Sequence, residues 1–164
     1  MASGDTLATF LPGELEGPAT NYALYRLRNQ HPTLYFADGA TTFTAIFSGI
    51  MPRNYAAGGI TATIMWTAVP TSGNVEWGVA IERMDTGTDL DADSFASAQL
   101  SGATAVPATS GAPKYTAVAF TDGAQMDSLA VGQGFRLKVY RDPTVGNDTA
   151  AGDAEIMAIE VKET

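Results

Sequence analysis

Hydrophobic and polar residues alternate with a period of two along several short segments of this chain. From Ile60 to Val69, apolar residues fall on one face and threonines on the other. The segment 75–84 repeats the pattern, with Trp77 and Val79 on its apolar face. Such alternation is typical of strands that bury one face. The turn residues 71–74 between the two segments predict that they form a β-hairpin.

Comparable segments, separated by Gly, Pro, Asn and Asp, predict further strands at 6–11, 22–28, 33–36, 43–51, 94–106, 115–121, 135–141 and 155–162. Their spacing of about ten residues predicts an all-β fold, a single antiparallel β-sandwich of jelly-roll type with about eight strands. We expect it to span residues 1–164, with residues 1–20 as a candidate N-terminal arm. An immunoglobulin-like sandwich with Trp66 or Trp77 in its core is the alternative.

Charged residues are expected on the outer faces of these strands. The alternation in 135–141 directs Phe135 inward and predicts that all three cations, Arg136, Lys138 and Arg141, lie outside. Glu76 and Glu82 are expected on the outer face of one strand, about 20 Å apart at strand geometry. That separation is too large for the carboxylate pair of a glycosidase.

Composition excludes several classes of function. The chain has 9 Lys and Arg against 18 Asp and Glu, a net charge of -9, no cysteine and one histidine. An acidic chain argues against nucleic-acid binding, and the lack of cysteine excludes disulfides and thiolate sites. A catalytic triad would depend on His31, and no serine lies in a nucleophile-elbow motif. We therefore predict a protein without catalytic activity or cofactor. Neither a signal peptide nor a membrane span is recognisable, which predicts synthesis in the cytoplasm.

Asp89, Asp91 and Asp93 are a candidate calcium site in the acidic stretch 85–93. Carboxylates at alternate loop positions can converge on calcium. Ser94 and Leu100 stand where an EF-hand needs glycine and glutamate, so that motif is incomplete. A solvated acidic turn is the favoured alternative.

Two segments are candidates for an interface with another subunit. The loop 52–59 carries Arg53, Asn54 and Tyr55, and Arg and Tyr commonly anchor interfaces. A plain glycine-ended loop is an equal alternative. The N-terminal segment carries Leu7, Phe10 and Leu11, an apolar set suited to docking onto a neighbour.

Several blocks of the sequence resemble a family of small proteins from tailed bacteriophages and prophage-like regions. These blocks are MASGDTLATF, HPTLYF, MPRNYAAGG, FTDGAQMDSLAVGQGFRLKVYRD and AGDAEIMAIEVKET, and the similarity extends over essentially the whole chain. Members look like virion structural proteins, and none of the blocks marks a catalytic site. The resemblance implies a jelly-roll sandwich of the kind found in capsid decoration, or cement, proteins.

The resemblance further implies a homotrimer that bridges copies of the major capsid protein on the outer surface of the virion head. It implies no nucleic-acid or membrane partner. One rival function is a carbohydrate- or receptor-binding module of a tail fibre or baseplate, which requires exposed aromatic side chains. A calcium-dependent adhesion or accessory domain is the other rival.

Overall fold

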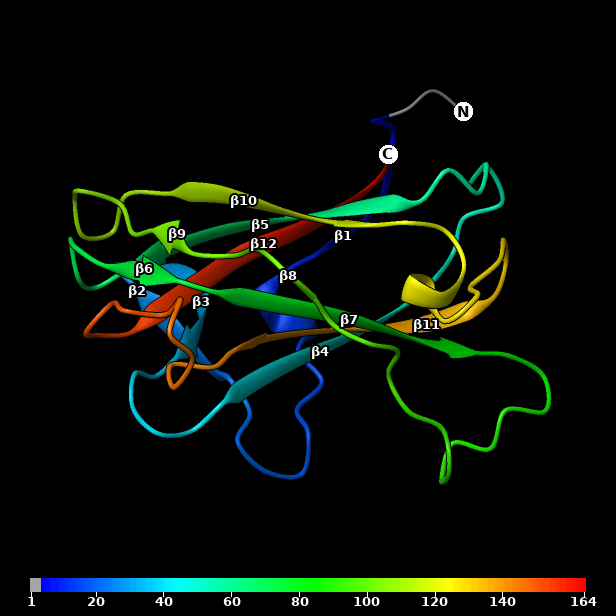
Figure 1. The fold of residues 1–164 in the computed structure, drawn as a ribbon, viewed down its shortest axis with the longest axis horizontal. Helices are drawn as coiled ribbons and strands as arrows, with labels where there is room; N and C mark the ends of the chain where they lie inside the picture. Colours follow the sequence, from blue (N-terminus) through cyan, green and yellow to red (C-terminus); the bar gives the residue numbers. More distant parts are fainter. Residues whose placement is uncertain (1–3) are drawn as a thin grey trace.

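Antiparallel strands in two layers make up this protein, as the computed structural model of residues 4–164 shows (Figure 1). The described elements, in chain order, are β1 (Thr6–Phe10), η1 (Pro12–Glu14), β2 (Leu24–Arg28), β3 (His31–Phe36), β4 (Phe43–Ile50), β5 (Ile60–Ala68), β6 (Asn74–Val75), β7 (Trp77–Met84), β8 (Gln99–Leu100), β9 (Thr104–Ala105), β10 (Lys114–Phe120), η2 (Ala124–Met126), β11 (Gly134–Arg141) and β12 (Ala154–Glu163).

The strands form two main sheets. Sheet A has the order β10-β5-β12-β3-β2, and β1 also pairs with β12. Sheet B has the order β4-β11-β7-β8, while β6 and β9 form a small separate pair. Figure 1 shows sheet A as the upper layer and sheet B as the lower one. The predicted all-β, antiparallel sandwich is confirmed.

The inward faces of the two sheets meet in one hydrophobic core. Trp66 of sheet A and Trp77 of sheet B are both fully buried. Their ring centroids lie 5.6 Å apart in an edge-to-face arrangement, a favourable geometry for aromatic pairs. The indole N–H of Trp66 donates to the Thr116 hydroxyl at 2.8 Å. Both tryptophans therefore lie in the core, as their strand faces predict.

The predicted hairpin between β5 and β7 is wrong. β5 pairs with β10 and β12 in sheet A, whereas β7 pairs with β11 and β8 in sheet B. Residues 71–74 thus carry the chain from one layer to the other. Alternation along a strand determines which face is buried, but it does not determine which strand lies alongside. The predicted strand at 94–106 is likewise reduced to the short elements β8 and β9.

The N-terminal segment is part of sheet A rather than a free arm. β1 pairs with β12, and Phe10 is 5% exposed and stacks on Phe47 at a centroid distance of 5.3 Å. Phe10 is therefore not available for the predicted contact with another subunit. Leu7 is partly buried against the same core, and only Leu11 is well exposed, at 53%. Residues 1–3 of the predicted arm lie outside the described part of the chain.

Arg141 lies inside the sandwich, contrary to the expectation that all three cations of β11 face outward. Arg136 and Lys138 occupy even positions, whereas Arg141 shares the odd positions of the inward-facing residues and is fully buried. Its guanidinium forms a paired ion contact with Asp148, with both N–O distances at 2.8 Å.

Within residues 4–164, no helix is long and apolar enough to cross a membrane.

Candidate ligand-binding groove

The outer face of sheet B carries the side chains of β11 that alternate with its core residues. Arg136, Lys138 and Tyr140 point away from the core, because Leu137 and Val139 between them are fully buried. β11 is a central strand, flanked by β4 and β7. Aromatic and cationic groups are therefore placed side by side on one central strand.

Tyr140 lies directly on the backbone of the neighbouring strand. Its partner in the register is Gly78 of β7. A Cβ atom at residue 78 would come within 2.1 Å of the Tyr140 ring. Burial raises the pKa of Tyr140, and the nearby carboxylates of Asp142 and Glu76 raise it further. Glycine in a strand commonly marks such a close approach, and here it places an aromatic ring against the sheet.

Lys138 lies between two aromatic rings. Its ammonium is 4.6 Å from the centroid of Phe95 and 5.9 Å from that of Tyr140. Within residues 4–164, no carboxylate forms an ion pair with it inside 4.0 Å. Burial lowers the pKa of Lys138, and the negative charge of Glu82 partly opposes that shift. The geometry thus presents a partly desolvated cation without a paired anion.

Arg136, by contrast, is neutralised by carboxylates on both sides. Its guanidinium lies 3.1 Å from Glu82 and 3.8 Å from Glu16. Glu16 also accepts a hydrogen bond from the Ser48 hydroxyl at 2.9 Å. Glu82 is only 4% exposed, which corrects the expectation of a solvent-facing carboxylate. This group of charges fixes the edge of the groove next to β4.

The opposite edge is built by the loop that follows β11. The buried Arg141 donates five hydrogen bonds, to Asp148 and to the carbonyls of Phe36, Ala150 and Gly152. Asn147 in the same loop donates to Glu76 at 2.7 Å, and Glu76 is 7% exposed. The loop after β11 is therefore held against Glu76 and forms a wall beside Tyr140.

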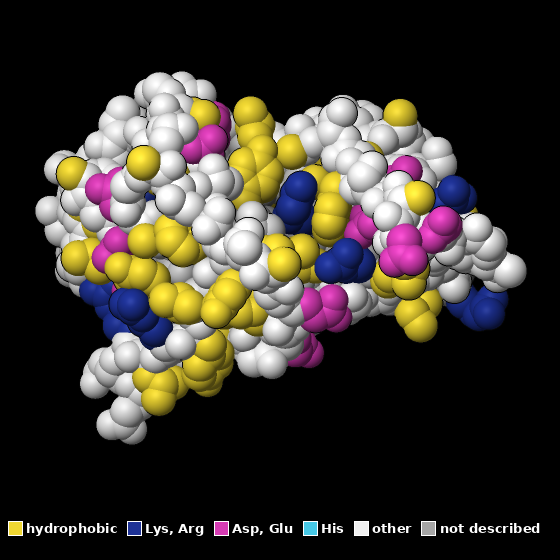
Figure 2. Space-filling model, turned by 90° about the horizontal axis from the view of Figure 1, so that it is seen from below, with side chains coloured by type: hydrophobic (Ala, Val, Ile, Leu, Met, Phe, Trp, Pro, Cys, Tyr) yellow, Lys and Arg dark blue, Asp and Glu magenta, His cyan; other side chains and the backbone are white. Residues whose placement is uncertain are grey.

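These features define the groove, by which we mean the surface on the outer face of sheet B around Phe95, Lys138 and Tyr140. Figure 2 shows this side of the molecule, where lysine or arginine and hydrophobic side chains lie together between two raised lobes. A cavity of about 80 Å³ adjoins Tyr140 and is lined also by Glu76, Gly78, Leu100, Asp142 and Val145. Ring faces, an ammonium and carboxylates together suit a ligand with both apolar faces and hydroxyl groups.

The three aspartates of the calcium hypothesis do not form a metal site. Asp89 accepts from the amide of Asp91 at 3.1 Å, and Asp93 accepts from the amide of Ser94 at 2.9 Å. Among the described residues, no three His, Cys, Asp or Glu side chains are grouped so that they could hold a metal ion. Asp89 and Asp93 instead cap the backbone of an acidic turn.

The loop candidates Arg53, Asn54 and Tyr55 are only partly at the surface. Arg53 and Asn54 are exposed, whereas Tyr55 is 5% exposed and belongs to the core. The Tyr55 hydroxyl donates to Asp122 at 2.9 Å and accepts from the Gly59 amide at 3.1 Å. Tyr55 therefore fastens its loop to the sandwich, and its predicted role at an interface is wrong.

Two residues of the groove, Gly78 and Phe95, were not identified from the sequence. Gly78 interrupts an otherwise apolar strand, a signal of close backbone approach that pointed to a ring above it. Phe95 lies in the segment 94–106, which was expected to be a strand and is mostly irregular. Because the chain between β7 and β8 folds back over sheet B, no sequence pattern places Phe95 near Lys138.

Comparison with solved structures finds jelly-roll carbohydrate-binding modules. The xylan-binding domain CBM22-2 from Paenibacillus barcinonensis is similar with a TM-score of 0.55 and 12% identity, covering 93% of this chain and 92% of that one. A CBM36 module in complex with calcium and xylotriose gives a TM-score of 0.52 and 11% identity, covering 94% and 99%. A CBM36-1 domain from the hindgut metagenome of Trinervitermes trinervoides gives 0.53 and 9%, covering 96% and 97%.

No family model and no curated protein sequence matches the chain. At such low identity the similarity establishes the fold alone. It confirms the jelly-roll type of sandwich, and it shows that this protein shares the fold of modules named for binding carbohydrate.

Proposed function

We propose that this protein is a non-catalytic carbohydrate-binding module whose ligand lies in the groove on sheet B. The observation that carries the proposal is the arrangement of Lys138 between the rings of Phe95 and Tyr140, on a rigid central strand. Sugar rings present apolar C–H faces that pack on aromatic rings, and their hydroxyls accept from ammonium groups and donate to carboxylates. The groove supplies each of these partners.

The fold supports the same function, because the xylan-binding neighbours cover nearly the full length of this chain. It also suggests the first ligands to test, xylan and xylotriose. Both tryptophans are fully buried, so the exposed aromatic surface that a carbohydrate-binding module requires has to come from Phe and Tyr. Phe95 and Tyr140, both half-buried, offer the aromatic surface of the groove.

The test is affinity electrophoresis of the purified protein in native gels that contain soluble xylan, with galactan and carboxymethyl cellulose in parallel gels. We expect retardation by at least one polysaccharide, and loss of retardation in Phe95→Ala and Tyr140→Ala. The matched control is Tyr115→Ala, which removes a 65% exposed ring from the edge strand β10 on the other sheet. Equal mobility in every gel would contradict the proposal.

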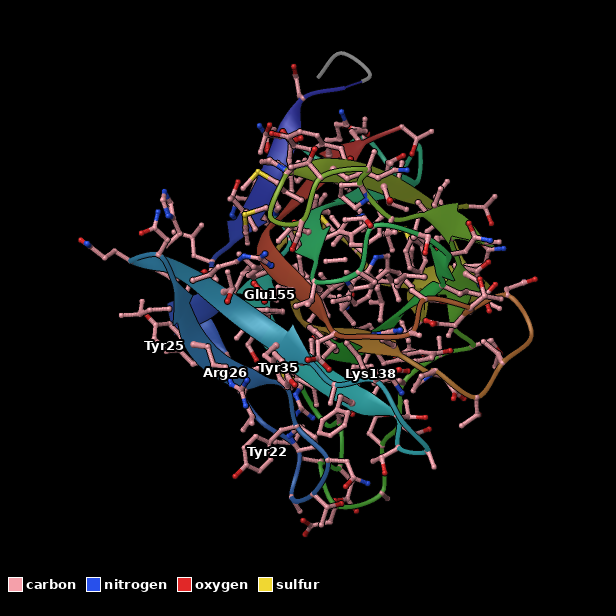
Figure 3. All side chains as sticks on the ribbon, turned by 90° about the vertical axis from the view of Figure 1, so that its left-hand side faces the viewer. Tyr22, Tyr25, Arg26, Tyr35, Lys138 and Glu155 are labelled. Carbon is pink, nitrogen blue, oxygen red and sulfur yellow. The ribbon has the colours of Figure 1, made fainter. Side chains whose placement is uncertain are left out.

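A second function, decoration of a bacteriophage capsid as a homotrimer, is supported by the resemblance in sequence blocks and by the open edge of β2. β2 is the last strand of sheet A, and Tyr25 and Leu27 on it are 51% and 62% exposed. Figure 3 shows Tyr25 projecting outward, while Arg26 lies over the Tyr35 ring at 3.6 Å. Open strand edges are sites where another chain can add a strand.

For this second function, light scattering after size exclusion should give the mass of a trimer, and the protein should cosediment with shells of the major capsid protein. Leu27→Lys should reduce both, whereas Leu90→Lys, at a residue 68% exposed in the acidic turn, should reduce neither. A monomer that never cosediments would exclude the function.

A further inference from the structure

A second pocket lies on the outer face of sheet A, on the side of the sandwich opposite the groove. It has a volume of about 300 Å³, at the lower end of the 300–1,000 Å³ usual for ligand pockets. Its floor comes from β5 and β12, one wall from the β2–β3 hairpin, and the other from the loop 107–113. The residues that line it include Arg28, His31, Thr33, Thr67, Ser110 and Met157.

Thr67 is the unusual residue of this floor. It faces away from the core, because its neighbours Trp66 and Ala68 point inward, yet it is only 1% exposed. Its hydroxyl oxygen is buried and forms no hydrogen bond within the described residues. A buried hydroxyl without a partner is destabilising, because no hydrogen bond offsets the loss of its contacts with water. A site that retains such a group is suited to a ligand that supplies the missing partner.

Glu155 adds a second unpaired atom next to Thr67. The two residues are direct partners in the register of β12 and β5. Glu155 is 8% exposed, and its Oε1 lies 3.2 Å from Arg28 while its Oε2 is buried without a hydrogen bond among the described residues. One acceptor and one hydroxyl thus lie side by side with unused hydrogen-bonding capacity.

The wall formed by the loop is fixed in place. Arg28 donates to the Ser110 hydroxyl at 2.8 Å, and Ser110 in turn donates to the Ala68 carbonyl at 3.3 Å. Gly111 has a φ of +87°, and a Cβ there would lie 3.2 Å from the Arg28 guanidinium. Glycine therefore lets the loop backbone approach Arg28 closely.

The charges of the pocket indicate the class of ligand. The positive charge of Arg28 is compensated by Glu155, so neither a strong anion nor a cation is favoured. Ser110 and Thr33 add hydroxyls, and Met157 adds an apolar surface. We propose that this pocket binds a neutral polyhydroxyl compound of the size of one sugar residue, with a hydroxyl that bonds to Thr67. The inference rests on the pocket's own residues and does not require the groove to bind carbohydrate.

The experiment is a methyl NMR titration of protein labelled at its six methionines, with D-xylose and D-galactose as probes. The Met157 signal is assigned with Met157→Leu. We expect saturable shifts of Met157 in the wild type and none in Thr67→Val, which keeps the shape of the side chain and loses the hydroxyl. That variant should fold with an unchanged or higher thermal midpoint, because it removes an unpaired polar atom. Thr63→Val, on the same face of β5 but outside the pocket, should bind as the wild type does.

Three outcomes would overturn the inference. The first is the absence of a Met157 shift with either sugar up to the solubility limit. The second is an equal shift in Thr67→Val, as expected if an ordered water satisfies both atoms. The third is a shift with inorganic phosphate and none with either sugar. The groove variant Phe95→Ala/Tyr140→Ala should leave the Met157 shift intact, so failure at one site is distinguishable from failure at the other.

Discussion

The ring of Tyr140 occupies the space that a side chain at Gly78 would fill, so an aromatic face is held against the backbone of β7. Replacing Gly78 by alanine must move the ring, because the added Cβ would lie 2.1 Å from it. We expect Gly78→Ala to weaken carbohydrate binding at least about tenfold, which corresponds to 1.4 kcal/mol. Overpacking should lower the free energy of unfolding by about 1–3 kcal/mol.

The matched control for this prediction is Gly146→Ala, since no atom outside its chain neighbours lies within 4 Å of a Cβ there. Isothermal titration calorimetry and urea denaturation measure the two effects. Unchanged affinity in Gly78→Ala would show that the position of Tyr140 does not matter for binding.

Lys138 is the second determinant of the groove. We expect Lys138→Met, which retains most of the side-chain length, to lower affinity about tenfold through loss of charge-assisted hydrogen bonds. The free energy of unfolding should not fall, because burial disfavours the charged ammonium, as its lowered pKa indicates. The control is Lys162→Met, a residue paired with Glu160 at 3.9 Å on the other sheet. Equal losses in both variants would point to the overall charge of the protein instead.

Arg141 maintains the wall of the groove beside Tyr140. Arg141→Met leaves the buried Asp148 carboxylate without its paired cation, and we expect a loss of about 3–5 kcal/mol in the free energy of unfolding. Urea denaturation followed by circular dichroism measures this change. The control is Glu160→Gln, which removes the exposed ion pair between Glu160 and Lys162. It should lower the free energy of unfolding by about 1 kcal/mol or less. A loss of similar size in both variants would contradict the structural role of Arg141.

Ionisation of Tyr55 makes the free energy of unfolding depend on pH in the alkaline range. Burial, followed by the hydrogen bond to Asp122, raises the pKa of Tyr55 from 10.0 to about 12. The folded state therefore keeps a proton that the unfolded state releases, so this contribution is complete below pH 10 and is lost as pH rises toward 12. Denaturation at a series of pH values should show this decline in the wild type and a smaller one in Tyr55→Phe. The same decline in both proteins would assign it to other groups.

The sequence predicted the sandwich and its buried faces but not the pairing of its strands. Trp66 and Trp77 were placed correctly because alternation records burial locally. β5 and β7 were paired wrongly because a short turn is compatible with a hairpin and with a crossing between sheets. Arg141 was assigned to the surface although its odd position in β11 already indicated the core.

The groove could be anticipated only in part. Lys138 was expected on an outer face, and the interrupted pattern at Gly78 held a signal for Tyr140 that was not used. The contact of Phe95 with Lys138 depends on how the segment after β7 folds back, a long-range arrangement without a local pattern. The unpaired hydroxyl of Thr67 is equally invisible in a sequence, because the loop 107–113 and Arg28 bury a residue that alternation places outside.

Calorimetric titration of xylotriose into the wild-type protein and into Phe95→Ala/Tyr140→Ala is the decisive test of carbohydrate binding in the groove. We expect binding of one or more molecules in the wild type, and loss of the groove-bound one in the double variant, with the far-ultraviolet circular dichroism unchanged. Binding of equal affinity and stoichiometry in both proteins would contradict it. So would the absence of heat with xylotriose, galactotriose and cellotriose alike.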